Sequence, residues 1–233
     1  MQIAEFDRFA DAYDEQHRAN ITITGEVPEY FAEYKIRVVS ELAHGLGAVA
    51  RILDFGSGIG GSIPHFRRYM PQARLTCADV SQRSLDLAEA RFPDLVNGML
   101  IEHERIPATD ASFDMAFSAC VFHHIPHREH VHWLRELRRV TRPGGMIVVF
   151  EHNPLNPLTV RAVRTCPFDV DARLIRAREL AARCHDAGWA HPTVRYHLFF
   201  PRTLSLLRPL EHRLRQFPLG AQYSVVAVAP AAG

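Results

Sequence analysis

"LDFGSGIGGS", residues 53–62, is the stretch that decides the fold. The apolar run at 51–55 predicts a short buried strand. This strand ends at Gly56, Gly58 and Gly60, three glycines at every second position. Glycine adopts positive φ and lets the backbone come close to a ligand. Since ligands of open α/β sheets bind beyond the carboxyl ends of the strands, this turn is a candidate binding site. A tight turn without a ligand is the plainer alternative.

Strands and helices are predicted to alternate around this turn. Strands are expected at 51–55, 73–80, 98–103, 112–120 and 146–152, and helices at 62–70, 81–92 (with Ser81 as N-cap) and 128–141. The "RPGG" at 142–145 is expected to end the last of these helices. Alternating strands and helices form βαβ units with right-handed crossovers, which predicts a parallel sheet.

The alternation breaks after residue 152. The stretch 153–171 contains three prolines and has no clear period. Beyond it we expect a helix at 173–187, strands at 193–200 and 222–229, and a helical segment at 203–217. We interpret the chain as a single domain in three parts. These are an N-terminal helical cover (1–45), a sheet core (46–152), and a cap with the C-terminal strands (153–233).

Composition narrows the class of protein. Of the 233 residues 47% are apolar, and the net charge of +1 argues against a protein that neutralises many nucleic-acid phosphates. Four scattered cysteines form no C-x-x-C pair, which disfavours a disulfide framework or a zinc–thiolate site. No stretch reaches the roughly 20 apolar residues that span a bilayer. We expect a soluble, cytoplasmic protein with a small-molecule substrate and neither a nucleic-acid nor a membrane partner. Its oligomeric state stays open.

A second motif follows the turn. The strand predicted at 73–80 carries Asp79, roughly 20 residues beyond the glycines, where an acidic residue binds the hydroxyl pair of a ribose. The alternative is an acid at a helix N-terminus, ahead of Ser81, stabilised by the helix dipole.

Four successive stretches together resemble one known family. They are "ILDFGSGIGGSIPHF", "LTCADVSQRSLDLAEARF", "IPATDASFDMAFSACVFHHI" and "LRELRRVTRPGGMIVVFEHNP". In this order they resemble the motifs of class I S-adenosylmethionine-dependent methyltransferases (type 11-like), over about residues 51–153. The resemblance implies a Rossmann-like α/β fold. Its seven-stranded mixed sheet has the order 3-2-1-4-5-7-6, with the seventh strand antiparallel, and S-adenosyl-L-methionine is the cofactor.

The resemblance also implies a set of cofactor-binding residues. Asp54 and the turn would hold the methionyl part, Asp79 the ribose, and Val80 the adenine ring. Glu102, with the His103 backbone beside it, stands where the family often has an aspartate for the adenine amino group. The complete set is Tyr13, Asp54, Gly56, Ser57, Gly58, Gly60, Asp79, Val80, Glu102, His103, Ser118 and His123.

Three residues are catalytic candidates: Tyr13, His123 and Asn153. Tyr13 resembles a tyrosine that closes over the cofactor in some family members, although it also fits an ordinary amphipathic helix. His123 follows the tip of the fourth strand. Asn153 lies just beyond the fifth strand, where it would contact substrate or cap a turn before Pro154.

The segment "VFHHIPHREHVHW" (121–133) contains five histidines, and imidazole is a common metal ligand. On a helix from residue 128, His130 falls on the apolar face and His132 nearly opposite. Pro126 separates both from His123 and His124. Imidazoles dispersed in this way do not converge on one ion, so no metal site is predicted.

Three functions remain open. The first is methyl transfer to a small-molecule acceptor in a bacterial-type biosynthetic pathway. The second is intramolecular cyclisation of S-adenosylmethionine to azetidine-2-carboxylate with release of methylthioadenosine, since the chain resembles azetidine-2-carboxylate synthases in size and cap organisation. The third is a cofactor-binding module without catalysis. A nucleic-acid methyltransferase is disfavoured because the fourth strand ends in "SACVFH", not in N/D-P-P-Y/F.

Overall fold

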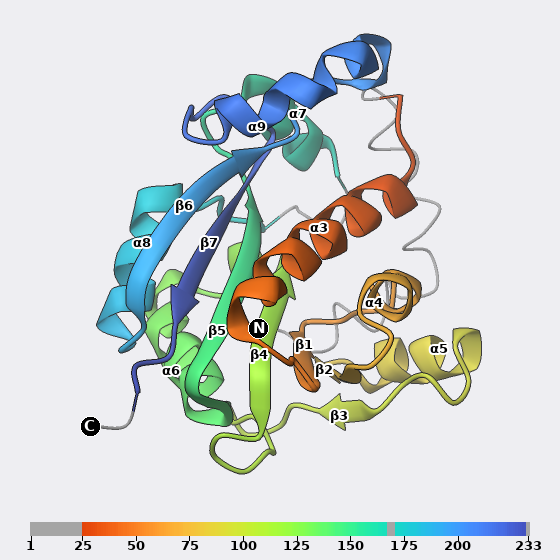
Figure 1. Ribbon diagram of the computed structural model, residues 1–233, viewed down its shortest axis with the longest axis vertical. Helices are drawn as coiled ribbons and strands as arrows, with labels where there is room; N and C mark the ends of the chain where they lie inside the picture. Colours follow the sequence, from red (N-terminus) through yellow and green to blue (C-terminus); the bar gives the residue numbers. More distant parts are fainter. Residues whose placement is uncertain (1–24, 167–170, 232–233) are drawn as a thin grey trace.

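A seven-stranded mixed sheet runs through the computed structural model, which describes residues 25–166 and 171–231 (Figure 1). In the described residues the strand order is β3-β2-β1-β4-β5-β7-β6. The strands are β1 (Arg51–Phe55), β2 (Arg74–Asp79), β3 (Gly98–Leu100), β4 (Phe113–Ala119), β5 (Thr141–His152), β6 (Ala190–His197) and β7 (Gln222–Val228). The first five pair in parallel, and β7 is antiparallel to β5 and β6. The predicted fold and strand order are confirmed.

Helices cover both faces of the sheet (Figure 1). On one face lie α3 (Pro28–Ala43), α4 (Ile63–Tyr69) and α5 (Gln82–Arg91), and on the other α6 (His130–Val140) and α8 (Ala177–Asp186). Short 3-10 helices are η3 (His44–Leu46), η4 (Phe122–His124) and η5 (His127–Glu129). At the top of Figure 1, α7 (Pro157–Thr165) lies near η7 (Arg202–Leu210) and α9 (Glu211–Leu214).

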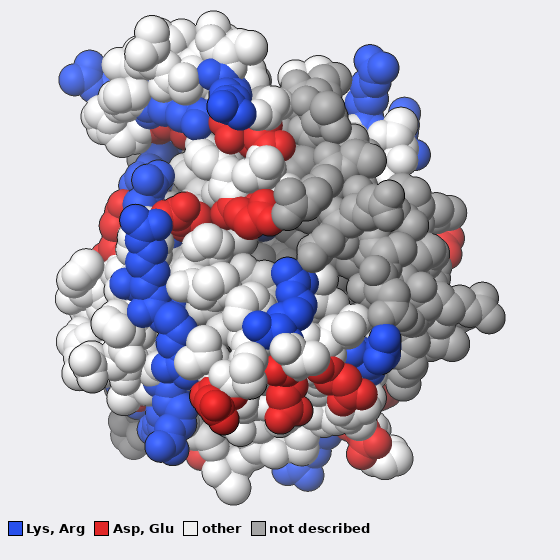
Figure 2. All heavy atoms as spheres, turned by 90° about the vertical axis from the view of Figure 1, so that its right-hand side faces the viewer, with Lys and Arg blue, Asp and Glu red and all other residues white. Residues whose placement is uncertain are grey.

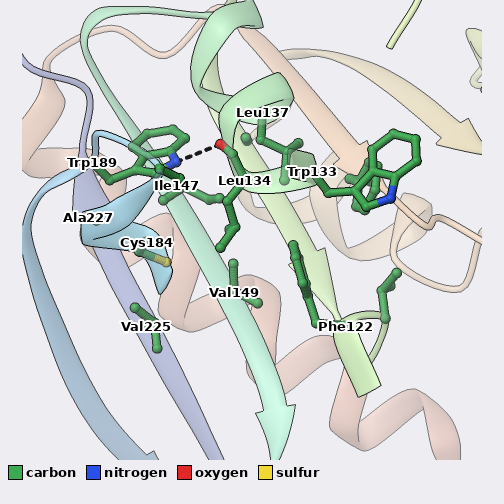
Figure 3. Packing of buried hydrophobic residues seen from close by; sticks show 14 of the residues in the cluster. Phe122, Trp133, Leu134, Leu137, Ile147, Val149, Cys184, Trp189, Val225 and Ala227 are labelled. Carbon is green, nitrogen blue, oxygen red and sulfur yellow. Dashed lines mark hydrogen bonds between the residues drawn. The ribbon is translucent and has the colours of Figure 1, made fainter. Parts of the chain in front are cut away.

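Each face of the sheet carries its own apolar cluster because side chains alternate along a strand. In β1, Leu53 and Phe55 join the α6–α8 cluster, whereas Ile52 joins the α3–α5 cluster. Figure 3 shows the α6–α8 cluster, in which the buried Trp189 indole donates a hydrogen bond of 2.9 Å to the Leu134 carbonyl. The two clusters hold the central strands rigidly, so residues at the strand ends have fixed positions.

The prediction that β5 begins at 146 is wrong: β5 starts at Thr141, directly after α6. Phe113 of β4 pairs with Thr141 and Met115 pairs with Met146, so β5 has extra residues at this point. The "RPGG" sequence forms this irregular part of the strand, and Gly144 adopts a φ of 73° there. Proline and glycine are tolerated inside a strand at such bulges.

The stretch 153–171, for which no element was predicted, contains α7. The start of α7 carries the usual signals of a helix N-terminus. The Asn156 side chain accepts hydrogen bonds from the Leu158 and Thr159 amides, and Pro157 occupies the first turn. The nearby prolines mask these signals in the sequence.

Two other predicted elements are shifted or changed. The helical segment expected at 203–217 is mostly 3-10 helix, because Leu204 has non-helical angles and Pro209 interrupts the amide ladder. The strand expected at 193–200 starts three residues earlier, at Ala190, across a register shift against β7.

Ser81 caps α5 as predicted, since its hydroxyl accepts a hydrogen bond of 3.0 Å from the Ser84 amide. Ser81→Ala is expected to lower the free energy of unfolding by about 1 kcal/mol because this amide loses its partner. Urea denaturation measures the change, with Gln82→Ala at the next, exposed position as the control. Equal stability of Ser81→Ala and Gln82→Ala would contradict the role of the cap.

Candidate active site

The glycine turn leaves the end of β1 with positive φ angles of 73° at Gly56, 52° at Gly58 and 81° at Gly60. A Cβ at Gly56 would lie 2.4 Å from Val121 Cγ2, and one at Gly60 would lie 2.5 Å from Ile63 Cδ1. A Cβ at Gly58 would meet nothing within 4 Å. Gly56 and Gly60 therefore allow close packing, whereas Gly58 borders open space.

Asp79 ties the end of β2 to this turn. Its side chain is buried, and its two carboxylate oxygens accept hydrogen bonds from the Gly58 amide at 2.8 Å and the Ser81 amide at 3.0 Å. Val80, next in sequence, is half-buried and packs on the core. The predicted acid and the predicted turn thus form one unit.

Asp54 lies at the end of β1 with 3% of its surface exposed, and its carboxylate accepts a hydrogen bond from the Ser62 hydroxyl. Burial raises the pKa of Asp54 to about 7, opposed by the Ser62 hydrogen bond and reinforced by the charge of Asp79. The charge of Lys35 also lowers this pKa. Asp54 therefore titrates near neutral pH.

A buried ion pair joins the penultimate residue of β5 to the loop after β4, on the α6 side. His123 Nδ1 is 2.7 Å from Glu151 Oε2, and each side chain is 1% exposed. Glu151 Oε1 accepts hydrogen bonds from the Val121 and Phe122 amides at 3.0 and 2.7 Å. Burial alone would raise the pKa of Glu151, but His123 and these contacts hold it at about 2. The carboxylate fixes both the loop after β4 and the His123 ring.

A second polar group lies on the α3 side of the same strand ends, and we name it the thiol cluster: Lys35, Cys120, His152 and Gln222. Lys35 Nζ is 3.5 Å and Gln222 Nε2 is 3.8 Å from Cys120 Sγ. Burial would raise the pKa of Cys120, but the charges of His152 and Lys35 lower it to about 7. None of these four residues is in the set of site residues predicted from the sequence. The signal available in the sequence was the position of Cys120, His152 and Gln222 directly at the ends of predicted strands.

The other predicted site residues are dispersed. Glu102 and His103 are exposed, and His103 has a φ of 51°. Ser118 is fully buried within β4, and its hydroxyl has no hydrogen-bond partner among the described residues. Tyr13 lies outside the described residues.

Asn153 is 1% exposed, and its amide holds a turn together. Nδ2 donates to the Pro218 and Gly220 carbonyls at 3.1 and 2.8 Å, and Oδ1 accepts from the Leu155 amide at 3.0 Å. The side chain is therefore engaged in the turn-capping arrangement that was the alternative to substrate contact.

The histidines of 121–133 occupy different environments. His130, the first residue of α6, is fully buried with Nε2 2.9 Å from the Ile125 carbonyl, whereas His132 is exposed. The His123 ring lies 4.1 Å from that of His124 and 5.1 Å from that of His152, between centroids. In residues 25–166 and 171–231 no group of three His, Cys, Asp or Glu side chains is arranged to hold a metal ion.

Figure 2 shows Lys and Arg side chains interspersed with Asp and Glu on the face at the right of Figure 1. The described part of this face is therefore not uniformly basic, as a surface for a phosphate backbone would be. Of the helices in the described ranges, none has the length and apolar character that a membrane crossing requires.

The strand order, the glycine turn and the acid at the end of β2 define a Rossmann-like protein that binds a nucleoside-containing cofactor at the carboxyl ends of its strands. Residues 52–145 match the family model described as a methyltransferase domain. This region of the chain is similar to class I S-adenosylmethionine-dependent methyltransferases, in agreement with the resemblance of its sequence motifs.

Individual relatives agree with this assignment. The chain is 32% identical to the demethylmenaquinone methyltransferase of Thermotoga maritima over 65% of this chain and 61% of that protein. It is 31% identical to the ubiquinone/menaquinone biosynthesis C-methyltransferase of Hahella chejuensis over 51% of this chain and 49% of that one. It thus spans about half to three-fifths of the length of these curated relatives.

A solved structure shows the same fold over the whole length. The crystal structure of an S-adenosylmethionine-dependent methyltransferase from Thermotoga maritima matches with a TM-score of 0.70 at 18% identity. The match covers 98% of this chain and 100% of that one.

S-adenosylmethionine, the cofactor of this family, is compatible with the site. It carries a ribose hydroxyl pair, an ammonium group and a sulfonium cation, and two buried carboxylates, Asp54 and Asp79, lie at the ends of adjacent strands. The space at Gly58 leaves room for a ligand next to the backbone. The donor set therefore suits a cofactor with hydroxyls at one end and positive charge at the other.

Proposed function

We propose that the protein transfers the methyl group of S-adenosylmethionine to a small-molecule acceptor in a biosynthetic pathway. One observation carries this proposal: Asp79 is hydrogen-bonded to the glycine turn at Gly58, with Asp54 buried beside it. These carboxylates lie at the glycine turn, where a Cβ at Gly58 would meet nothing within 4 Å. The C-methyltransferase named among the relatives supports transfer to an organic acceptor.

We assign roles from this geometry and from the family resemblance. Asp54 and the turn hold the methionyl part of the cofactor, and Asp79 holds the ribose. Val80 packs on the adenine, with Glu102 and the His103 backbone near its amino group. The family role of Ser118 is to receive the cofactor ammonium through its backbone carbonyl. Tyr13, which lies outside the described residues, keeps its proposed role as a closing residue.

The protein contributes to methyl transfer mainly by positioning the cofactor and the acceptor. The bound cofactor supplies an electrophilic methyl group on a sulfonium, and the acceptor must present a nucleophile in line at about 3–3.5 Å. Glu151 is hydrogen-bonded to His123 and to the loop after β4, and we assign this loop to the acceptor side of the cofactor. A fixed loop holds the acceptor in a reactive orientation and excludes water.

Product analysis by mass spectrometry tests the proposal. The purified protein is incubated with S-adenosylmethionine alone, and separately with a panel of phenols, quinols, amines and carboxylic acids. We expect S-adenosylhomocysteine and a methylated product only when an acceptor is present. Methylthioadenosine with a cyclic amino acid in the reaction without acceptor would establish the cyclisation instead. Cofactor binding without turnover across the panel would favour the non-catalytic module.

Cofactor affinity is expected to increase with pH through about 7, the raised pKa of Asp54. Only the ionised carboxylate attracts the ammonium group of the cofactor's amino-acid end, so affinity should increase about tenfold from about pH 6 to about pH 8. The effect of pH on stability without cofactor has the opposite sign to its effect on cofactor affinity. Because the folded pKa is raised, the contribution of Asp54 to stability is present at low pH and is lost as the pH rises through about 7.

Isothermal titration calorimetry with S-adenosylhomocysteine, which has no sulfonium, measures this pH dependence. Asp54→Asn should flatten the profile, since an amide does not titrate. A wild-type affinity that is independent of pH would contradict the role of Asp54 in cofactor binding.

A further inference from the structure

The thiol cluster is assembled from four separate elements at the ligand-bearing edge of the sheet. Lys35 comes from α3, His152 from the end of β5 and Gln222 from the start of the antiparallel β7. Cys120 directly follows β4 with a φ of 59°, a left-handed conformation that is costly for a residue with a Cβ. Its amide is held by the Phe150 carbonyl at 2.8 Å. The chain thus maintains a strained backbone that places this thiol.

Gln222 provides an independent indication of a ligand. It is 6% exposed, and its amide nitrogen points to Cys120 Sγ. Its Oε1 is buried and has no hydrogen-bond partner among the described residues. A ligand O–H or N–H that donates to this buried acceptor would give it the partner that it lacks among the described residues. The unpaired Oε1 thus belongs to the same amide group whose nitrogen contacts the Cys120 thiol.

The charges around Cys120 favour its thiolate. Lys35 on α3 and His152 on β5 are the cationic neighbours, Glu151 on β5 opposes them, and Gln222 on β7 donates a hydrogen bond. Lys35 is 9% exposed, so little water screens its charge from the sulfur. With a pKa of about 7, a large fraction of Cys120 is ionised at neutral pH.

We propose that the thiol cluster binds an acceptor with an ionisable hydroxyl, of the phenol or enol class, and that Cys120 is the base that removes its proton. A neighbouring O–H or N–H of the acceptor donates to Gln222 Oε1. This inference rests on the proposed methyl transfer and deepens it, because it defines the class of acceptor and the group that activates it.

The proposed step balances as follows. The acceptor hydroxyl proton moves to Cys120 Sγ, and the resulting oxyanion lies beside the Lys35 ammonium. The acceptor's oxygen, or a carbon conjugated to it, then forms the bond to the methyl carbon as the carbon–sulfur bond breaks and its electron pair goes to sulfur. The proton on Cys120 then returns to solvent. No oxidant or further reactant is needed.

Alkylation tests the thiolate without any turnover. Wild-type protein is treated with iodoacetamide across a range of pH, and each cysteine is followed by peptide mass spectrometry. Cys120 should react well before Cys77, Cys166 and Cys184, which are buried. Lys35→Met should shift the midpoint of Cys120 reactivity to higher pH because the cation is lost. Arg37→Met, at an exposed cation on the same helix, is the matched control and should leave it unchanged.

The bound ligand is tested with 4-nitrocatechol, whose visible absorbance reports ionisation and which has two adjacent hydroxyls. At a pH below its solution pKa, wild-type protein saturated with S-adenosylhomocysteine should bind it in the ionised form. Cys120→Ser and Lys35→Met should lose this absorbance change. Gln222→Leu should weaken binding of 4-nitrocatechol but leave 4-nitrophenol, which lacks the second hydroxyl, unaffected.

Turnover gives the final measurement once the acceptor panel has yielded a substrate. Cys120→Ser should lower kcat about a hundredfold and remove the rise of the pH–rate profile near 7, with S-adenosylhomocysteine affinity retained as evidence of correct folding. An unreactive Cys120, a 4-nitrocatechol bound in the neutral form, or an unchanged pH–rate profile in Cys120→Ser would overturn the inference. Absence of turnover despite a reactive, Lys35-dependent Cys120 would count against the proposed function instead.

Discussion

Gly56→Ala is expected to weaken S-adenosylhomocysteine binding about a hundredfold. The added Cβ would lie 2.4 Å from Val121 Cγ2 at a φ of 73°. A left-handed alanine costs about 1–2 kcal/mol, and crowding a packed interior costs about 1–3 kcal/mol. The turn can relieve this strain only by moving away from Val121, which also displaces Gly58 from Asp79. A loss of about 3 kcal/mol corresponds to roughly a hundredfold in affinity.

Isothermal titration calorimetry measures this effect, and Gly61→Ala is the matched control. Gly61 lies in the same turn, but its φ is not positive and its Cβ would meet nothing within 4 Å. Gly61→Ala should therefore bind the cofactor product like the wild type. Similar affinities for Gly56→Ala and Gly61→Ala would show that the close approach to Val121 does not shape the site.

Glu151→Ala is expected to destabilise the protein by about 3–5 kcal/mol, the range for breaking a buried ion pair. The substitution leaves the Val121 and Phe122 amides and the His123 ring without their acceptor in a site closed to water. Since total stability is typically about 5–15 kcal/mol, this is a large fraction. Glu151→Gln, which retains the size of the side chain and one acceptor oxygen, should lose less stability than Glu151→Ala.

Urea denaturation of both variants measures the effect, with Glu89→Ala on the exposed face of α5 as the control. The wild type should also lose stability in acid. The pKa of Glu151 is depressed to about 2, so its contribution is present above the ordinary carboxyl pKa and is lost as the pH falls toward 2. Stability of Glu151→Ala close to that of Glu89→Ala would rule out this structural role.

The parts of the fold that depend on local patterns were predictable. The glycine turn, the alternation around it and the Ser81 cap each have a short-range cause, and each was confirmed. Strand order came from the family resemblance, because alternation alone does not order the strands. The predicted start of β5 was wrong because proline and glycine normally interrupt a strand or helix, whereas here pairing with β4 accommodates them in a bulge.

The candidate site was predictable only where it follows the chain locally. Asp54, Gly58 and Asp79 lie at strand ends that the periodicity defines, and their proximity follows from a parallel sheet. The contact of Lys35 with Cys120 joins residues 85 positions apart. It depends on how α3 packs across the sheet, including a hydrogen bond of 3.2 Å between Tyr34 and His197. No local pattern encodes this packing.

The thiol cluster also bears on how such a protein diversifies. The matched family region, residues 52–145, includes the glycine turn, Asp79 and Cys120, but three members of the thiol cluster lie outside it. Lys35 precedes this region, and His152 and Gln222 follow it. Mutations in the flanking stretches therefore alter the surroundings of the thiol without changing a residue of the glycine turn, although the charge of Lys35 also acts on Asp54. Under the proposed function, substitutions at these flanking positions would change the choice of acceptor while the sequence of the cofactor turn stays the same.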